Sequence, residues 1–560
     1  MFSRWVSLPN IDAWAKTPQL RWLYLLLLVV VGFFAFFHNI DLSLYGCTEG
    51  LYASVTREML RTQRFLHPTY FGHVYNNKPP LFFWIQALST SFLGENEFAL
   101  RLPAACFSLG TMALTYQLGK TLFSRTAGLW ASMVVATTYV YLWHGRMAII
   151  DPALTFFMTL ALLAWTQGYF RPSRSWWYVL SFLAMALATM LKALHAFVLP
   201  ALLILVFLIT QRDLRTANVR PIMFGFILSC ALVSTYYWSL GSEFAQRFLV
   251  LENLSRIFGS LDPGNTVEAS RTEPVYWYLL MMGFDFFPWW FLLPPSVILL
   301  FSHRPLRKHP KELFVLLWCV VYFLALSVVP EKHERYLMPI VPGFGLLIGY
   351  YYHAVFTSSE QKEWATLPFK LMLGLLSVVY IVVMFLAPFL LHRKWHVPTS
   401  VFPHIYVVTM IGFCGVLLYS LIRSKVRLAL TTVGILAFGF LAGVTHLVIP
   451  AIDQVASPRL LVAETKTFLK SPQDPILVYG SLSWRSDEDL YYQFFEHSGV
   501  RLITKEELED VVHEAGQTVL LTEKQYVTEL RLAQKLSFDI LREFRRPNRQ
   551  ILLVSIKRNQ

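Results

Sequence analysis

The sequence predicts an α-helical membrane protein that crosses the bilayer many times and carries a small α/β domain at its C-terminal end. The 560 residues are 55% hydrophobic and 15% charged, with a mean hydropathy of +0.48. A soluble chain of this length would have about a quarter of its residues charged. In addition, apolar runs long enough to cross a bilayer recur up to residue 450, and the composition changes after that point.

The apolar runs predict about thirteen membrane spans, placed by length and composition. The first is interpreted as a retained span, because the polar segment before it is too long for a secretory signal. The run 79–94 is apolar but short, so we expect a helix that lies in or partly in the interface. The spans are expected near 22–38, 101–123, 127–143, 152–170, 176–191, 195–210, 221–239, 275–301, 312–329, 336–355, 369–389, 404–422 and 428–449.

The loops between these spans sort into two kinds by charge. One kind is short and basic, as in "HRPLRKHPK" at 303–311, and is expected to be cytoplasmic together with the N-terminus. The other kind is longer or carries specific polar residues. Because an odd number of spans puts the two ends of the chain on opposite sides, the second kind and the tail are expected in the periplasm of a bacterium. The outer segments are 39–100, 144–151, 192–194, 240–274, 330–335, 390–403 and 451–560.

The tail at 451–560 has the composition of a small extramembrane α/β domain. Short apolar runs such as "DPILVYG", "RLIT", "TVLLTE" and "QILLVSIK" predict strands. The segments "LVAETKTFLK", "DEDLYYQFFEH" and "EKQYVTELRLAQK" have helical spacing. The tail has no Gly-rich phosphate loop and no metal-ligand cluster in its sequence, so we assign it no catalysis.

The net charge of +13 indicates basic cytoplasmic loops rather than nucleic-acid binding, because no basic soluble face interleaved with aromatic residues is present. The five cysteines are scattered without a CxxC pair, which indicates neither a disulfide framework nor a zinc site.

Cations and carboxylates recur in the outer loops. For a single one, the simpler interpretation is a side chain that snorkels to the interface or pairs structurally, and Arg57 and Glu58 are expected on the solvated face of a helix over about 49–61. The outer residues that we single out are Thr48, Glu49, Tyr52, Lys78, Arg146, Asp151, Lys192, Arg256, Lys332, Arg335 and Tyr336.

Their gathering at one membrane face predicts a site for a phosphate or pyrophosphate, because several cations at one depth suit an anion with several oxygens. A phosphate at the membrane boundary, beside grooves lined with Phe and Trp, is the head of a phospholipid or polyprenyl carrier. Glu49 and Asp151 could act there as a general base on a hydroxyl acceptor. They could instead be structural partners of the cations, and the sequence leaves both roles open.

In these loops the chain resembles the GT-C superfamily of polyprenyl-phosphate-dependent glycosyltransferases. The resemblance is to the bacterial branch with the lipid A aminoarabinose transferases and relatives of protein O-mannosyltransferases. That branch has Asp-Glu-x-Arg-Tyr-Ala and then "AREML" in its first outer loop, where this chain has "TEGLYA" at 48–53 and "TREML" at 56–60. Further matches are "NKPP" at 77–80, the Asp-Pro at 151–152, "NLSRI" at 253–257 and "RYLMPIVP" at 335–342.

The resemblance implies a GT-C fold and transfer of a sugar from undecaprenyl phosphate to an acceptor such as lipid A, a glycan or a protein at the periplasmic face of the inner membrane. It implies a site that needs no metal ion, since cations can neutralise the leaving phosphate. The candidates for that role are Lys78, Arg146, Lys192, Arg256, Lys332, Arg335 and Tyr336. The alternative is a flippase, a transporter or a non-catalytic binder of polyprenyl-linked lipids.

The chain departs from the branch at three positions of the resemblance. Thr48 stands where the first acid is expected, Leu51 replaces the arginine, and Asn77 replaces the glutamate before Lys78. A threonine cannot act as a base at neutral pH. We therefore expect Glu49 or Asp151 to carry the acid–base chemistry, or the acceptor to be a phosphate that needs no deprotonation. Thr48 and Tyr52 are assigned to the acceptor side of the loop.

Overall fold

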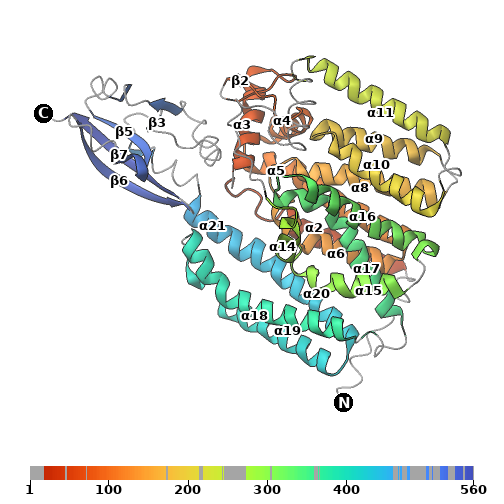
Figure 1. The fold of residues 1–560 in the computed structure, drawn as a ribbon. Coiled ribbons are helices and arrows are strands. Elements are labelled where there is room, and N and C mark those ends of the chain that lie inside the picture. The colour runs from red at the N-terminus through yellow and green to blue at the C-terminus, as the bar shows by residue number, and fades with distance from the viewer. Residues whose placement is uncertain are drawn as a thin grey trace.

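The computed structural model confirms a mostly helical chain with a small sheet at its C-terminal end (Figure 1). It describes residues 18–457, except 45–46, 71, 172–174, 214–218, 243, 245–272, 303–305, 359–363, 365 and 396. Beyond these it describes 465, 467–468, 476–479, 500–503, 507–508, 517–527, 536–546 and 549–558.

Long helices that pack along one another form the bulk of the molecule. The longer ones are α2 (Pro18–Phe36), α5 (Glu97–Leu122), α6 (Arg125–Thr137), α8 (Asp151–Phe170), α9 (Trp176–Leu191), α10 (His195–Gln211), α11 (Val219–Ser239), α16 (Pro310–Val328), α17 (Val341–Thr357), α18 (Leu367–Trp395), α19 (His404–Ile422) and α20 (Val426–Ala442). The shorter ones are α3 (Cys47–Thr62), α4 (Leu81–Leu93), α7 (Tyr139–His144), α14 (Trp277–Asp285), α15 (Leu293–Ser302) and α21 (Ile449–Ala456).

Each expected span coincides with a helix or a helix pair, and the chain is a multi-pass membrane protein. Within the described residues, eight helices are long and apolar enough to cross a bilayer, and α9 and α10 are shorter apolar helices. The total of thirteen spans stays a prediction. The segment expected as one span at 275–301 is instead two helical pieces, Trp277–Asp285 and Trp289–Phe301, bent by 105° at the break between them.

The break in this span lies next to a second break, between α6 and α7. The sequence predicts α6 and α7 together as one span over 127–143. The backbone N–H of Tyr139 donates to the carbonyl of Phe287 (3.0 Å). The indole N–H of Trp289 donates to the hydroxyl of Thr137 (2.8 Å). Backbone groups freed at a helix break need partners inside an apolar bundle. Here the carbonyl of Phe287 at one break accepts from the backbone N–H of Tyr139 at the other, and the side chains of Trp289 and Thr137 add a second link.

Glycines let the central helices approach closely. A methyl group on Gly349 of α17 would lie 2.2 Å from the carbonyl oxygen of Ala127 on α6. A methyl group on Gly128 of α6 would lie 2.4 Å from the carbonyl oxygen of Tyr116 on α5. Small residues at such contacts permit the close packing on which helix association in membranes depends. The three helices thus form a rigid platform below the loops of the site.

The first outer loop folds into α3, a short hairpin of β1 (Thr69–Tyr70) and β2 (His73–Val74), and α4. The helix expected over about 49–61 is confirmed as α3. Its expected solvated face is wrong, because Arg57 and Glu58 are both buried. Arg57 forms an ion pair with Glu95 (3.0 Å), beyond the end of α4. The Arg57 side chain is thus buried while its partner Glu95 is 39% exposed, and the helical pattern of α3 alone cannot reveal a partner that comes from another segment.

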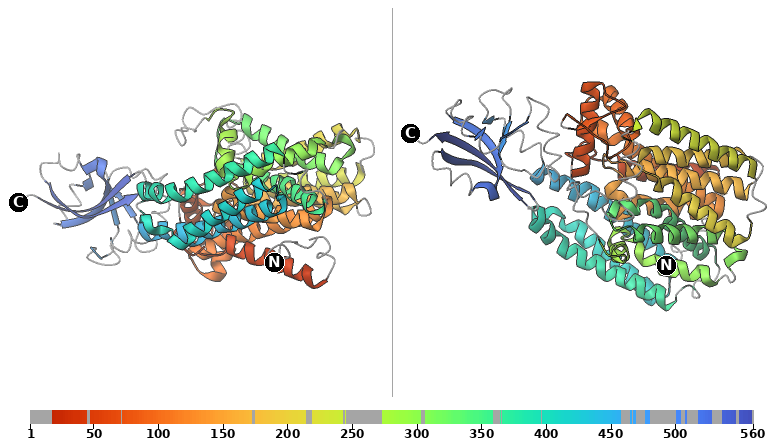
Figure 2. Two further views of the ribbon diagram at one scale, coloured as in Figure 1. Left: turned by 90° about the horizontal axis from the view of Figure 1, so that it is seen from below. Right: turned by 45° about the horizontal axis from the view of Figure 1, so that its top comes forward.

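The loop after α2 packs against the end of α21, so the first and last parts of the helical bundle meet (Figure 1). The backbone N–H of Ser43 donates to the carboxylate of Asp453 (3.1 Å), and the hydroxyls of Ser43 and Ser457 are within 2.5 Å of one another. Figure 2 shows that the C-terminal sheet stands apart from the helical bundle, beyond α21.

The C-terminal part contains a five-stranded mixed sheet in the order β4-β3-β5-β7-β6. Its strands are β3 (Ile476–Tyr479), β4 (Val500–Ile503), β5 (Gln517–Glu523), β6 (Leu536–Arg546) and β7 (Arg549–Arg558). β3 pairs in parallel with β4 and β5, whereas β7 pairs antiparallel with β5 and β6. The four expected strands are confirmed, and β6 is an additional one. The expected helices over 461–470, 487–497 and 523–535 lie largely outside the described residues.

Candidate active site

The candidate site lies where four segments end at one face of the helical bundle. Asp151 is the first residue of α8, and Lys192 follows the last residue of α9. The 3₁₀ helix η5 (Glu334–Ile340) supplies Arg335. Thr48 lies in the first turn of α3. Because each segment begins or ends at this depth, polar side chains far apart in sequence come together above an apolar core.

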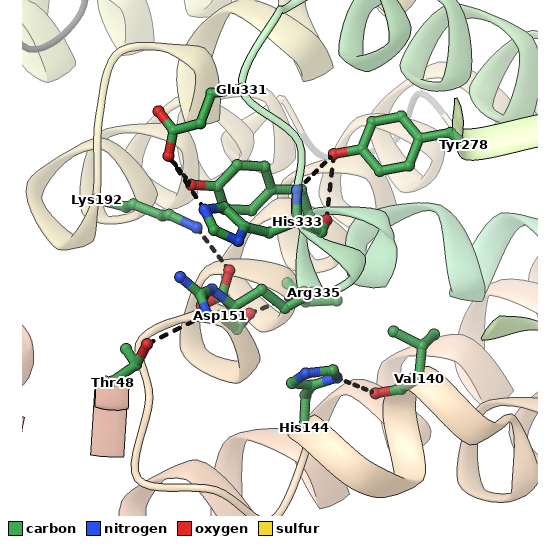
Figure 3. A network of polar contacts seen from close by, with 11 residues as sticks. Thr48, Val140, His144, Asp151, Lys192, Tyr278, Glu331, His333 and Arg335 are labelled. Atoms are coloured by element: carbon green, nitrogen blue, oxygen red, sulfur yellow. Dashed lines mark hydrogen bonds and ion pairs between the residues drawn. The ribbon is translucent and has the colours of Figure 1, made fainter. Parts of the chain in front are cut away.

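Asp151 is the centre of this group (Figure 3). The ammonium of Lys192 donates to Asp151 Oδ1 (2.6 Å), and Arg335 Nε lies 3.7 Å from Asp151 Oδ2. The side chains of Asp151 and Lys192 are 4% and 5% exposed, whereas that of Arg335 is 24% exposed. Arg335 Nη1 also donates to the hydroxyl of Thr48 (3.2 Å). A buried carboxylate thus holds two cations, and one of them reaches the surface.

A second carboxylate, Glu331, organises the other side of the group. The hydroxyl of Tyr336 donates to Glu331 Oε1 (3.3 Å), and His333 Nε2 lies 3.2 Å from the same oxygen. The Lys192 ammonium stands 4.3 Å from the centre of the Tyr336 ring, within the range of a cation–π contact. Tyr336 therefore links the two carboxylates: its ring faces Lys192 while its hydroxyl binds Glu331.

Lys332 points to a different neighbour. Its ammonium donates to the backbone carbonyls of Val329 and Glu273 and lies 5.9 Å from the centre of the Tyr278 ring. Burial lowers the pKa of Lys332 below that of an exposed lysine, and the Glu273 carboxylate opposes this shift. Lys332 adjoins the Asp151 group through the backbone of His333, which exchanges hydrogen bonds with the Tyr278 hydroxyl.

Glu49 lies apart from this group, in a bidentate ion pair with Arg101 of α5. Arg101 Nε and Nη2 donate to the two carboxylate oxygens, both at 2.8 Å. The backbone N–H of Ala148 donates to Glu49 Oε1 as well (2.6 Å), and the Glu49 side chain is fully buried. Both oxygens of Glu49 are therefore engaged, which is the geometry of a structural partner rather than of a base open to a substrate.

Arg101 uses all five of its N–H donors in this clamp. Besides the two bonds to Glu49, it donates to the backbone carbonyls of Ile40 (3.1 Å), Leu42 (2.6 Å) and Ser43 (2.8 Å). The planar fork of a guanidinium suits such a set of acceptors. Arg101 thus fixes the loop between α2 and α3, and with it the position of Thr48 next to Arg335.

Arg146 belongs to the surroundings of this clamp and not to the Asp151 group. It donates through Nη2 to the backbone carbonyl of His38. It lines a small cavity together with Glu49 and Arg101. The sequence places Arg146 among the ligands of the donor phosphate; the structure separates it from Lys192 and Arg335.

The remaining residues singled out from the sequence lie in the first loop or outside the described residues. Lys78 is half-buried and donates to the carbonyl of Asn77 (3.0 Å). Tyr52 is buried, with its ring centre 5.3 Å from that of Phe83, and so belongs to the apolar core between α3 and α4. Arg256 and the "NLSRI" segment fall outside the residues that the structure describes.

Two residues in or beside the candidate site escape the sequence patterns: Arg101 and Glu331. Arg101 stands at the start of an apolar span, and an ionisable residue inside such a span is itself a signal of a specific partner. Glu331 is adjacent to Lys332, in a segment whose cations dominate the pattern. Among the described residues, no three His, Cys, Asp or Glu side chains gather as metal ligands do. That a metal is not required stays a prediction.

Comparisons with known proteins bear on the fold. The family model for dolichyl-phosphate-mannose-protein mannosyltransferases matches residues 77–238. The crystal structure of ArnT from Cupriavidus metallidurans bound to undecaprenyl phosphate superposes with a TM-score of 0.73 at 19% sequence identity, covering 95% of this chain and 97% of that chain. The chain therefore has the ArnT fold, and the resemblance to GT-C glycosyltransferases is confirmed.

Two curated relatives match the chain over part of its length. The undecaprenyl phosphate-alpha-4-amino-4-deoxy-L-arabinose arabinosyl transferase 1 of Pseudomonas fluorescens is 28% identical over 342 residues, which are 59% of each chain. An uncharacterised protein of Aquifex aeolicus is 28% identical over 328 residues, or 58% of this chain and 62% of the relative. The matched region thus spans about three-fifths of these curated relatives.

Proposed function

We propose that the protein is a glycosyltransferase that moves a sugar from a polyprenyl phosphate carrier to an acceptor at the periplasmic face of the bacterial inner membrane. The observation that carries the proposal is the buried group of Asp151, Lys192 and Arg335 at one end of a GT-C fold. The fold is shared with an ArnT that was crystallised with undecaprenyl phosphate, and a relative is named as an arabinosyl transferase that uses this carrier.

The chemistry of such a transfer suits this group. When the acceptor attacks the anomeric carbon, the bond to the carrier oxygen breaks and the polyprenyl phosphate leaves with growing negative charge. Donors fixed in advance at the place where charge develops stabilise that transition state most. Lys192 and Arg335 are held at Asp151 before any substrate binds. The exposed edge of Arg335 gives the phosphate a way to reach them.

The roles that we propose follow from these contacts. Lys192, Arg335 and Tyr336 bind the donor phosphate, with Lys78, Lys332 and Arg256 as further ligands from the surrounding loops. Asp151 is the carboxylate nearest to the reacting groups, either as general base or as the counter-ion that holds both cations. Glu49 positions the first loop through Arg101 instead of acting as a base. Thr48 and Tyr52 stay on the acceptor side of the loop.

The test uses the whole protein in its own cell. The gene is deleted, and lipid A, polysaccharides and glycoproteins are compared by mass spectrometry before and after complementation. We expect one sugar modification to disappear on deletion and to return with the unaltered gene. We also expect Lys192→Met to lower the transfer rate by about 100-fold or more, as is typical for loss of one transition-state donor. Lys78→Ala should abolish the modification too.

Lys425→Met is the matched control. Lys425 also stands over an aromatic ring, 5.4 Å from the centre of Tyr419, but it lies in the short turn between α19 and α20. Its replacement should leave the modification intact. The proposal would be contradicted if deletion left the masses of lipid A, polysaccharides and glycoproteins unchanged. Full sugar transfer by the Lys192→Met protein would contradict it as well. Movement of intact carrier-linked sugar across vesicles without transfer would favour a flippase.

A further inference from the structure

A small polar cavity lies beside the ion pair of Glu49 and Arg101. These elements supply its lining: the loop after α2, α3, α5, α7, the α7–α8 connection and the start of α21. The lining includes Asn39, Glu49, Arg101, Trp143, Arg146 and Ile449. It leaves about 20 Å³ for the centre of a water-sized group. That is enough for a single water molecule or one oxygen of a larger ligand.

Arg146 gives this cavity a positive charge that makes no direct ion pair among the described residues, although Glu49 and Asp41 are near enough to interact with it electrostatically. The residue is 5% exposed, and its Nη1 is buried with no hydrogen-bond partner among the described residues. The same part of the chain also contains no carboxylate within ion-pair distance of Arg146. Glu49 lines the cavity, but both of its oxygens are bound by Arg101 and Ala148. Nη2 of Arg146 is bound by the carbonyl of His38, but a buried Nη1 without an acceptor is costly, so an anionic oxygen is a group that fits.

The cavity opens beside an apolar cluster that joins three helical segments. Val397 and Ile452 are buried there, and the ring of Trp143, which also lines the cavity, packs against them. Ile449 of α21 adds a further apolar wall. A cation next to apolar side chains suits a ligand that carries an anionic head on an apolar body.

We propose that this cavity is a second anion subsite, in which Arg146 binds a phosphate oxygen of an amphipathic acceptor. That the ligand is the acceptor rests on the proposed function. The subsite differs from the donor phosphate group in its residues, because Lys192, Arg335 and Tyr336 are not among the side chains that line the cavity. A donor phosphate at the Asp151 group and a phosphate at Arg146 would therefore be held by different residues.

The test measures binding, so it does not depend on catalysis. The full chain in detergent is titrated with dioctanoyl phosphatidic acid, and the complex is followed by native mass spectrometry. We expect Arg146→Gln to weaken this binding roughly tenfold to a hundredfold, the range for loss of a hydrogen bond to a charged group. Arg146→Lys should restore part of it. Ile449→Phe, which narrows the cavity and leaves every charge in place, should weaken it as well.

Arg427→Gln is the matched control, because Arg427 is also a partly buried arginine that donates to a backbone carbonyl, that of Ser358, away from the cavity. Undecaprenyl phosphate is titrated in parallel and reports the donor site. Its binding should persist in Arg146→Gln and fall in Lys192→Met, and this pattern separates failure of the subsite from failure of the proposed function.

Two further titrations distinguish a lipid phosphate from free phosphate as the ligand. Dioctanoyl phosphatidylcholine, with the same chains but no net charge, should not compete with dioctanoyl phosphatidic acid. Inorganic phosphate should compete at the same site. If it binds as tightly as the lipid, the subsite is confirmed and free phosphate is its ligand. Phosphatidic acid binding that Arg146→Gln and Ile449→Phe leave unchanged, or that Arg427→Gln weakens equally, would overturn the proposal.

Discussion

At the scale of single residues, Asp151 and Glu49 are both buried carboxylates paired with cations, but their surroundings differ. Glu49 faces one arginine with both oxygens and receives a backbone N–H in addition. Asp151 faces a lysine and an arginine whose guanidinium is partly exposed. The contacts of Glu49 shield its carboxylate from any ligand. The contacts of Asp151 include Arg335, whose side chain reaches the surface. This difference decides which carboxylate can meet a substrate.

Replacing Glu49 should therefore cost stability more than chemistry. Glu49→Gln leaves Arg101 buried without its counter-ion, which typically destabilises a protein by about 3–5 kcal/mol. We expect a lower thermal unfolding midpoint in detergent but a pH–rate profile of unchanged shape in the surviving protein. If the acidic limb of that profile disappears in Glu49→Gln and persists in Asp151→Asn, then Glu49 is the base after all.

Asp151 and Lys192 should behave as one unit. Their buried contact of 2.6 Å means that removal of either partner leaves the other charged group uncompensated. The double variant Asp151→Asn/Lys192→Met should then lose less stability than the sum of the single variants, by about 0.5–3 kcal/mol. Thermal unfolding of the four proteins measures this coupling. Additive losses would show that the contact contributes little.

At the scale of elements, the break between α14 and α15 is the feature that an apolar pattern hides. Asp285, the last residue of α14, is fully buried, and within the described chain neither carboxylate oxygen has a hydrogen-bond partner. Glu334, Tyr139 and Tyr278 are its titratable neighbours, and all three would be anions when ionised. Within the described part of the chain, the break therefore carries an acid with no compensating cation, in contrast to Asp151.

This contrast predicts opposite effects of the same substitution. Asp285→Asn removes an uncompensated acid and should raise the free energy of unfolding by about 1 kcal/mol. Asp151→Asn removes a compensated one and should lower it. Both variants replace one carboxylate oxygen with an amide nitrogen, so each serves as the control for the other in thermal unfolding. A loss of stability in Asp285→Asn comparable with that in Asp151→Asn would contradict this interpretation.

At the scale of the whole molecule, the loop after the first span is joined to the last helices by polar contacts. His38 Nε2 lies 3.2 Å from Nδ1 of His446, which belongs to the π-helical segment η8 (Gly443–Val448) between α20 and α21. The side chain of Asn39 donates to His38 and to the carbonyl of Thr445. These contacts close the bundle next to the cavity of Arg146.

The histidine contact should make the fold sensitive to acid. Burial lowers the pKa of His38, and His446 and Arg146 lower it further, while Asp41 opposes them. Below a pH of about 6.5 the unfolded chain takes up a proton at this residue more readily than the folded chain, so acidification favours unfolding. We expect the thermal unfolding midpoint to fall from pH 7.5 to 5.5, and His38→Gln to reduce that fall.

His404→Gln is the control for this experiment, because His404 is an exposed histidine at the start of α19. It should leave the pH dependence unchanged. If His38→Gln unfolds with the same pH dependence as the unaltered protein, the histidine contact is not the acid-sensitive element.

The class of the molecule follows from the sequence alone, because bilayer thickness fixes the length of an apolar span and short apolar runs mark the strands of the tail. The apolar runs located the helices, and the loop motifs indicated the GT-C fold that the comparisons confirm. Length and hydropathy are local properties, so they can be read without knowing which helix packs against which.

Which polar residues meet depends on how the helices pack. The sequence could not tell Glu49 from Asp151, since both follow apolar spans. It also grouped Arg146 with Lys192, although Lys192 pairs with Asp151 and Arg146 lines the cavity beside Glu49 and Arg101. It also missed Arg101, whose partners are about 50 to 60 residues away in the chain. Ion pairs of this kind depend on distances between helix ends, and those distances are set by close packing at glycines such as Gly349 rather than by any local pattern.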